Sequence, residues 1–474
     1  MMQRLLTKYG LAFHVACICL LPLCFFAQSR AFGCLPLFWL SLIAIEWLIL
    51  LPSIRRDETL ADARQRVLRA FWRDPFLYAG LAVIGLVGGQ CLNSGCELVY
   101  LPDADVWKLS APPIPWAVFS VESGASVLQL AVFTACLAVG VILRTAVGKA
   151  ARRFLLQSLS GISGIVALVC IELVRRGDER WGALASGAEA SAVGIYFGFW
   201  LLVGMGLFAE ALAGRRRERI WLFLTCFLGN LLGLIWFASP LAILACVIMV
   251  VLLFIYWLIY LAPLVTKSTQ VLLFLSTMGC VSVIVVGLIL FAPNPVSEKL
   301  EKALPLTEYC HEMSLRNGVR AKAAISVWRE YPWVGVGANG FYHTVGLVVD
   351  AGDWKVFEKD RAHVYNDGIQ FLCEYGMIGV GFLVVSLIAL LGPICYRARL
   401  VWKKQVSGME LDRLFLFRLP PVVVTGALAL LLCCLESANA SPFRSAAVLL
   451  SWVCVLSSMP AFLPEKPREE LREG

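Results

Sequence analysis

Residues 239–262 read SPLAILACVIMVVLLFIYWLIYLA and contain no charged side chain. A helix rises about 1.5 Å per residue, so this stretch can cross the ~30 Å hydrocarbon core of a bilayer. Similar stretches recur along the chain. In the whole sequence, 59% of the residues are hydrophobic and only 16% are charged. Because a backbone in lipid must satisfy its own hydrogen bonds, each stretch is expected to be a helix. The sequence therefore predicts an all-α polytopic membrane protein.

About twelve apolar stretches are candidate transmembrane helices. They cover residues 11–28, 35–53, 76–93, 121–143, 154–174, 191–213, 219–237, 239–262, 270–292, 366–394, 418–436 and 443–463. Lys and Arg in short loops stay on the cytoplasmic side. With this number of spans, the arginine-rich loops after the second, fourth and sixth spans fall on one side, together with both termini. These loops explain most of the +8 net charge, so we expect no binding to nucleic acid.

The chain is expected to have three parts. Residues 1–292 would form a bundle of about nine transmembrane helices, and residues 366–474 would form three more with a short cytoplasmic tail. Between them, residues 293–365 would form one large outward loop, which faces the periplasm if the organism is Gram-negative. Inside this loop, residues 308–331 carry apolar side chains at four-residue steps, and Pro332 ends the pattern. This periodicity predicts an amphipathic helix beside the membrane.

Two arginines in this amphipathic helix are candidate phosphate-binding residues. Arg316 and Arg320 are four residues apart, so they project from one face of a helix. Paired guanidinium groups suit a diphosphate, although both could instead pair with neighbouring glutamates or remain solvated.

Glycines follow the amphipathic helix in the order Gly335-Val-Gly337-Ala-Asn-Gly340. This order matches a dinucleotide-binding pattern, but that pattern requires a preceding strand in a soluble βαβ unit. Here the glycines follow a helix on the outer face. We therefore expect a tight turn in which the backbone at Gly337 approaches a ligand.

Residues 363–379 read HVYNDGIQFLCEYGMIG and lead from the loop into the tenth span. Asn366 and Asp367 stand where an N-cap belongs, and capping is the preferred role for Asp367. Gln370 and Glu374 are four residues apart and share a helical face just inside the membrane. A carboxylate at that depth usually faces the bundle interior or a polar cavity, so both are candidate sugar contacts.

Structural roles are expected for two other pairs of residues. Cys91 and Cys96, at the outer end of the third span, are a candidate disulfide. Gly376 and Gly379 are expected to permit close helix packing rather than to touch a substrate.

The sequence resembles the O-antigen ligase and polymerase superfamily in the order of four features. These are an Arg-bearing helix, Pro-x-x-Gly-x-Gly, a His-Asn-Asp type box and Gln-x-x-x-Glu-x-Gly-x-x-Gly. The corresponding stretches are Arg316–Gly340 and His363–Gly379, and the resemblance extends over roughly residues 220–395. It implies about twelve spans and a glycosyltransferase. Such an enzyme moves a glycan from an undecaprenyl diphosphate carrier to an acceptor hydroxyl, on lipid A core or another glycan, at the outer, periplasmic face of the bacterial inner membrane. The resemblance also implies inversion at the anomeric carbon and no cofactor, nucleotide or metal.

The resemblance also implies which side chains take part in the reaction. Arg316 or Arg320 would hold the diphosphate, and His363 would accept the proton of the acceptor hydroxyl. In the family a histidine directly precedes the Asn, whereas Tyr365 has that place here and His363 matches the first histidine of a His-x-His-Asn pattern. The expected substrate contacts are Tyr365, Asn366, Gln370, Glu374 and Gly337.

Two other classes of function remain open. About twelve spans also suit a secondary transporter, although transporters usually bind substrate at broken helices near the membrane midplane rather than in one outer loop. Three histidines share the loop, His311, His343 and His363, so a metal-dependent hydrolase is a further alternative function. Their spacing matches no metal-binding motif.

Overall fold

The computed structural model describes residues 58–101, 106–176, 187–213, 220–261, 306–358, 361–407 and 419–463. The predicted first, second and ninth spans and both termini lie outside these residues. The chain divides into two compact units. One comprises Met1–Leu155, Glu312–Gly392 and Ser437–Ser458, and the other Leu156–His311, Pro393–Glu436 and Met459–Gly474.

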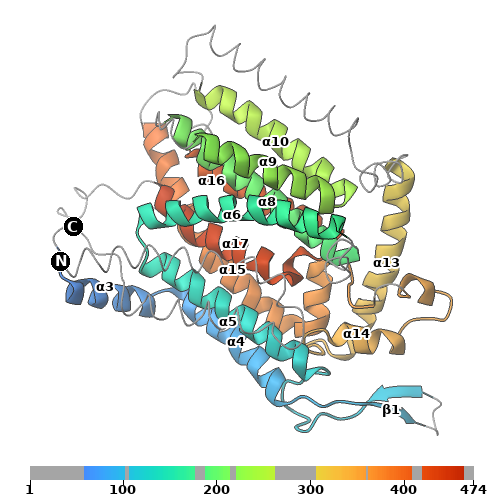
Figure 1. The fold of residues 1–474 in the computed structure, drawn as a ribbon. Helices are drawn as coiled ribbons and strands as arrows, with labels where there is room; N and C mark the ends of the chain where they lie inside the picture. The colour runs from blue at the N-terminus through green and yellow to red at the C-terminus, as the bar shows by residue number, and fades with distance from the viewer. Residues whose placement is uncertain are drawn as a thin grey trace. The chain divides into compact units, whose positions relative to one another are not determined.

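Five helices in the described part are long and apolar enough to cross a membrane. They lie within α4 (Pro75–Leu92), α5 (Ser123–Thr145), α6 (Lys149–Arg175), α8 (Gly187–Ala213) and α15 (Asp367–Ser407) (Figure 1). The other apolar helices are α9 (Ile220–Phe237), α10 (Pro240–Leu261), α16 (Pro421–Glu436) and α17 (Ala446–Ser458). The all-α class is therefore confirmed for the described residues. The number of twelve spans and the orientation in the membrane stay predictions.

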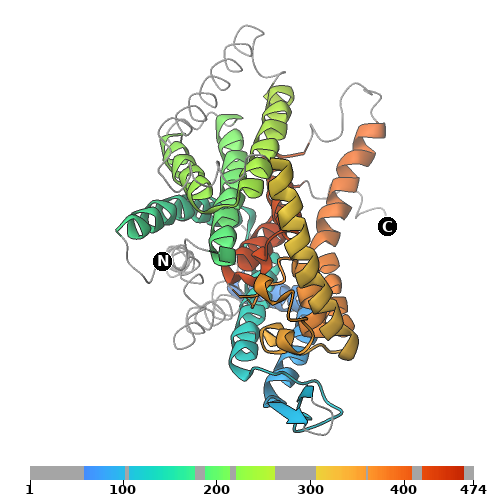
Figure 2. The same cartoon turned by 90° about the vertical axis from the view of Figure 1, so that its right-hand side faces the viewer.

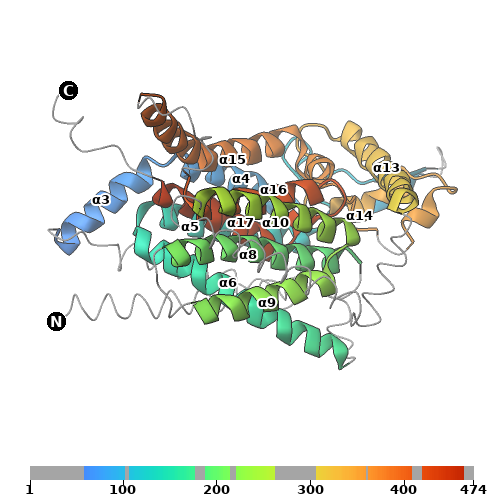
Figure 3. The same cartoon turned by 90° about the horizontal axis from the view of Figure 1, so that it is seen from above.

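In the first unit, α5 packs against both α4 and α17. Figure 3 views these helices from above. Helix α4 begins at the N-cap Asp74, whose carboxylate accepts a hydrogen bond from Phe76 N at 3.1 Å. Arg144, in the last turn of α5, donates to both oxygens of Asp74 at 2.7 and 2.8 Å. This bidentate ion pair joins the start of α4 to the end of α5. Before α4, the amphipathic helix α3 (Leu60–Trp72) begins with a capping box.

A β-hairpin connects the other ends of α4 and α5. Strands β1 (Leu98–Leu101) and β2 (Val106–Leu109) pair antiparallel, with Tyr100 opposite Trp107. The hairpin extends away from the helix ends (Figure 1). After it, the backbone N–H of Ser120 donates to the carbonyl of Asn93 at 3.3 Å, which returns the chain to the end of α4.

The predicted disulfide between Cys91 and Cys96 is wrong, because both cysteines are free thiols. Cys91 packs among apolar side chains of α4 and α5, whereas Cys96 follows Gly95, whose φ is +122°. Cys96 is buried beside Tyr331, and burial raises the pKa of its thiol. The turn at Gly95 therefore sends the two side chains into different surroundings.

The second unit is built around α8, which packs against both α9 and α16, while α10 contacts α8 and α16. Buried polar side chains tie α9 to α6. Asn230 accepts a hydrogen bond from Ser163 Oγ at 2.8 Å and donates to the carbonyl of Ser160 at 3.0 Å. Because the amide of Asn230 uses both its donor and its acceptor, this buried group is satisfied in an apolar setting.

The helix predicted at residues 308–331 is confirmed as α13 (Leu306–Glu330), which ends just before Pro332 as the sequence pattern indicates. Its position beside the membrane stays a prediction. Its apolar face contributes Ala323, Ala324 and Val327 to a core cluster that also contains Phe341 and Val364. The following segment contains α14 (Gly340–Thr344) and the short turns η5 (Val345–Leu347) and η6 (Trp354–Val356). Figure 2 looks onto this end of the molecule, with α13 in front.

Candidate functional site

Helix α15 is interrupted within its first three turns. Gly376 has φ +63° and ψ −172°, a conformation that only glycine adopts readily. The turn after α13 supplies the hydrogen bonds that the interrupted helix lacks. The carbonyls of Cys373 and Glu374 accept from the N–H groups of Val336 and Gly337 at 3.1 and 2.8 Å. In the opposite direction, the N–H groups of Met377 and Ile378 donate to the carbonyls of Pro332 and Trp333 at 2.9 and 3.1 Å.

Glycine is required on both sides of this junction between residues 332–337 and 373–378. A Cβ atom at Gly376 would collide with the backbone of Trp333, and one at Gly335 would collide with the backbone of Glu374. Gly335 also has φ +67°. The two glycine-containing motifs of the sequence therefore form one structural element, in which each motif completes the main-chain hydrogen bonds of the other.

Gly337 belongs to this junction as well. Its φ is +85°, its N–H is bonded to Glu374, and a Cβ atom would collide with Ser120. Gln90 on α4 adds a side-chain contact, because its Nε2 donates to the carbonyls of Val334 and Glu374 at 3.1 and 3.3 Å. The close approach expected at Gly337 is thus made to the protein itself. Its contact with a ligand stays a prediction.

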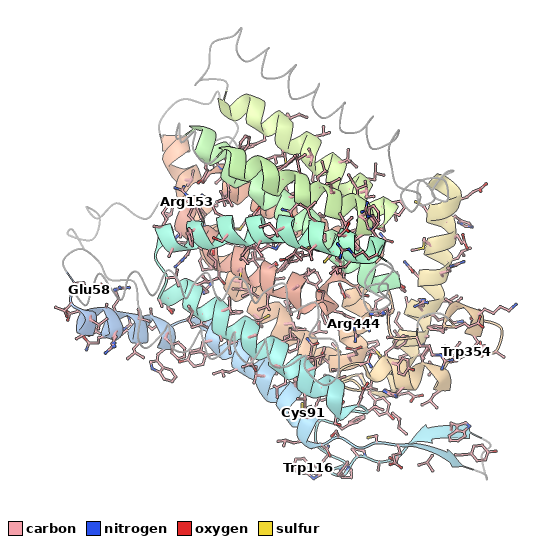
Figure 4. All side chains as sticks on the ribbon, in the orientation of Figure 1. Glu58, Cys91, Trp116, Arg153, Trp354 and Arg444 are labelled. Carbon is pink, nitrogen blue, oxygen red and sulfur yellow. The ribbon has the colours of Figure 1, made fainter. Side chains whose placement is uncertain are left out.

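A buried ion pair lies next to the junction. Arg444, in the turn η8 (Pro442–Arg444) before α17, donates through Nη1 to Glu374 Oε1 at 2.5 Å. The Glu374 side chain is only 3% exposed, and the Arg444 side chain is 20% exposed. An arginine side chain keeps its proton in proteins, and the carboxylate of Glu374 lies within hydrogen-bond distance of this one. The guanidinium is therefore charged. Figure 4 labels Arg444 and Trp354 toward the end of the molecule where α14 lies.

Gln370 connects the ion pair to the loop before α15. Its Nε2 donates to Glu374 Oε1 at 3.0 Å and to the carbonyl of Ala362 at 2.8 Å. Its Oε1 accepts from the N–H of Val364 at 3.1 Å. The shared helical face predicted for Gln370 and Glu374 is confirmed, and both side chains are buried in contact with one another.

On its other side the ion pair continues to a histidine. Arg444 Nη2 donates to Asn339 Oδ1 at 3.3 Å, and Asn339 Nδ2 donates to Glu122 Oε2 at 2.7 Å. The same carboxylate oxygen lies 3.0 Å from His343 Nε2. We refer to His343, Glu122, Asn339, Arg444, Glu374 and Gln370 as the polar network.

Arg320 holds the loop that precedes α15. It is 6% exposed, and its guanidinium donates to the carbonyls of His363 and Val356, each at 2.6 Å. The same group lies over the rings of Tyr365 and Phe357, at 4.7 and 5.3 Å from the ring centroids. Such stacking adds attraction between cation and ring. Arg320 therefore fixes the backbone on which His363 and Tyr365 stand.

Tyr365 has a strained backbone. Its φ is +58°, which a bulky side chain rarely adopts, and strain of this kind concentrates at functional sites. The ring of His363 lies 6.1 Å from the ring of Tyr365, and both side chains are partly exposed. The loop therefore brings together Arg320, His363 and Tyr365, three of the residues singled out from the sequence.

Capping at the start of α15 differs from the prediction. Asn366, not Asp367, is the capping side chain, since its Oδ1 accepts from the N–H of Ile369 at 3.0 Å. Asp367 is the first helical residue, and its buried carboxylate accepts from the N–H of Phe443 at 3.1 Å. The helix starts one residue earlier than capping by Asp367 requires, which turns the Asp367 side chain toward the turn η8.

Arg316 is not brought to the same place as Arg320. Its guanidinium donates to Glu312 at 2.5 Å, and both side chains are more than half exposed. The two arginines are neighbours on α13, but one faces solvent and the other is buried under the loop. Phosphate binding by Arg316 stays a prediction.

These different surroundings lead to a direct comparison of the two arginines. Arg320→Ala removes two hydrogen bonds from a charged donor, each worth about 1.5–3 kcal/mol, and is expected to lower the free energy of unfolding by at least ~3 kcal/mol. Arg316→Ala, which breaks an exposed pair, should change it by less than about 1 kcal/mol. Arg320→Lys should not restore stability, because an ammonium group lacks the planar fork that spans two carbonyls. Unfolding of the purified variants in detergent measures all three, and equal losses for the two alanine variants would contradict this assignment.

No protein-family model and no curated protein matches this chain. The candidate site is therefore defined by the contacts among its own residues. Within the described residues, no group of three His, Cys, Asp or Glu side chains is placed to hold a metal ion.

Sequence reasoning missed three members of the polar network, Glu122, Asn339 and Arg444. It raised a fourth, His343, only as a possible metal ligand. Two of the three missed residues left a signal, because Glu122 and Arg444 fall inside the spans predicted at 121–143 and 443–463. A charged residue inside a predicted span is a candidate functional residue. Asn339 has φ +57°, a conformation that asparagine tolerates better than most residues, but nothing in the sequence around it indicates its partners.

Proposed function

We propose that this protein is a membrane glycosyltransferase of the O-antigen ligase type. It would transfer a glycan from undecaprenyl diphosphate to an acceptor hydroxyl at the outer face of the bacterial inner membrane. The observation that carries the proposal is the junction between residues 332–337 and 373–378. The separate motifs that resemble the superfamily meet there in one element beside a buried ion pair.

The chemistry needs a stabilised diphosphate leaving group and a group that accepts the hydroxyl proton. Two partly exposed histidines, His363 on the loop held by Arg320 and His343 on α14, are the candidates for that group. Arg444 supplies a charged guanidinium at the adjoining end of α17. Arg320 acts in this proposal as a positioning residue, since its guanidinium donates to two backbone carbonyls. A lipid carrier is a suitable donor because the site adjoins apolar helices of membrane-spanning length.

Purified protein in liposomes tests the activity directly. A lipid-linked oligosaccharide donor and an acceptor glycolipid are supplied, and the larger product and the released undecaprenyl diphosphate are measured. Transfer by the wild-type protein supports the proposal, and its absence with donors of several glycan structures contradicts it. In a deletion strain, unattached polymer would indicate a ligase, and single repeat units would indicate a polymerase.

A secondary transporter is the second candidate, favoured by the interruption of α15 at Gly376. Discontinuous helices of this kind form substrate and ion sites in many transporters. Proteoliposomes distinguish the two functions. Uptake of a solute driven by an ion gradient, without any glycan product, would replace the glycosyltransferase proposal.

A further inference from the structure

His343 and Glu122 form a histidine–carboxylate pair outside the two stretches, Arg316–Gly340 and His363–Gly379, that carry the family resemblance. The Nε2 atom of His343 lies 3.0 Å from Glu122 Oε2. An ionised carboxylate only accepts hydrogen bonds, so Nε2 carries the hydrogen that it shares with Glu122. In the neutral ring the lone pair is then on Nδ1, where it can accept a proton.

The carboxylate of Glu122 is held in place by more than the histidine. Asn339 donates to the same oxygen at 2.7 Å, and Arg444 donates to Asn339 at 3.3 Å. The Glu122 side chain is 18% exposed, while the His343 side chain is 34% exposed. A shielded carboxylate and a more open imidazole form the arrangement in which a carboxylate orients a general base and stabilises its charged form.

The positions of both residues in the fold suit this role. Glu122 immediately precedes α5, and His343 lies on α14, so neither is inside an apolar helix. The N–H of Val121 donates to the carbonyl of Val336 at 3.1 Å, which attaches the segment carrying Glu122 to the glycine junction. The pair is thereby fixed to the same element that supports the Arg444–Glu374 ion pair.

We propose that His343 is the general base of the transfer reaction and that Glu122 orients it. This inference rests on the proposed glycosyltransferase function. The acceptor oxygen forms a bond to the anomeric carbon while its proton moves to Nδ1 of His343. The bond between that carbon and the phosphate oxygen breaks, and its electron pair leaves with undecaprenyl diphosphate. Glu122 stabilises the imidazolium that results.

The test is steady-state transfer in liposomes with an undecaprenyl-diphosphate-linked oligosaccharide and a glycolipid acceptor. Loss of a general base typically costs 10²–10⁴-fold in rate, so His343→Ala should lower kcat by at least about 100-fold and leave the donor KM within about threefold. Added imidazole should restore part of the activity of His343→Ala. Glu122→Gln should also lower kcat, and imidazole should not rescue it, because the base is still present.

Matched variants keep the outcome interpretable. His343→Gln retains a donor to Glu122, so it separates loss of the base from loss of structure if His343→Ala folds poorly. His311, an exposed histidine on α13, serves as the control, and His311→Ala should keep wild-type kcat. Full activity in His343→Gln, or imidazole rescue of His363→Ala instead, would overturn the proposal for His343 alone. Absence of transfer by the wild-type protein would overturn the proposed function and this inference together.

Discussion

Arg444→Ala is expected to destabilise the protein by about 3–5 kcal/mol, because it leaves the carboxylate of Glu374 buried without its charged partner. Glu374 would keep the hydrogen bond from Gln370, which does not replace a positive charge. The natural stability of a domain is about 5–15 kcal/mol, so this loss should sharply reduce the folded fraction. Unfolding of the purified variant in detergent measures the difference.

A double variant distinguishes loss of the pair from loss of packing. Arg444→Met with Glu374→Gln removes both charges while keeping similar volumes, and replacing a buried ion pair in this way is often close to neutral. The double variant should therefore be more stable than Arg444→Ala by several kcal/mol. Arg316→Ala is the control for removal of an exposed arginine. If the double variant is as unstable as the single one, the uncompensated charge is not the cause.

Gly376→Ala is expected to remove about 2–6 kcal/mol of stability. The backbone conformation at Gly376 costs a residue with a side chain about 1–3 kcal/mol, and the new Cβ atom would collide with the backbone of Trp333. Relief of that collision requires the junction to open. The N–H groups of Met377 and Ile378 would then lose their hydrogen bonds to the turn, each worth about 0.5–1.5 kcal/mol.

Helix α15 provides its own control for this substitution. Gly381 lies on the same helix, and a Cβ atom added there meets no atom within 4 Å. Gly381→Ala should leave the melting temperature in detergent unchanged or slightly higher, since alanine favours a helix over glycine. The comparison fails if both alanine variants melt at the same temperature.

The apolar helices and α13 could be predicted because their signals are local. An apolar run sets the position of a span, and α13 ends where Pro332 removes a backbone donor. The interruption at Gly376 has no such signal, since a glycine followed by Met-Ile-Gly looks like any packing glycine. The φ of Gly376 is determined by the turn at residues 332–337, which approaches from a distant part of the chain.

In the candidate site, too, contacts within one helix could be predicted and contacts between distant segments could not. Gln370 and Glu374 could be paired from their spacing on one helix. The partners Arg444 and Glu122 come from segments 70 and more residues away, so their contacts depend on how α5, α15 and α17 pack. For Arg316 and Arg320, spacing alone was misleading. It places both side chains on one face of α13, but it does not specify that Arg316 is exposed and Arg320 is buried.

The glycine junction also bears on how such a protein can change over evolutionary time. Its hydrogen bonds join main-chain atoms, so they do not depend on the side chains of Val334, Met377 or Ile378. Only the glycines are fixed by geometry, because a Cβ atom has no room there. Chains that keep this architecture therefore need to share only a few short glycine-containing sequence motifs. Kinship among them is better sought by comparing backbones than by comparing sequences.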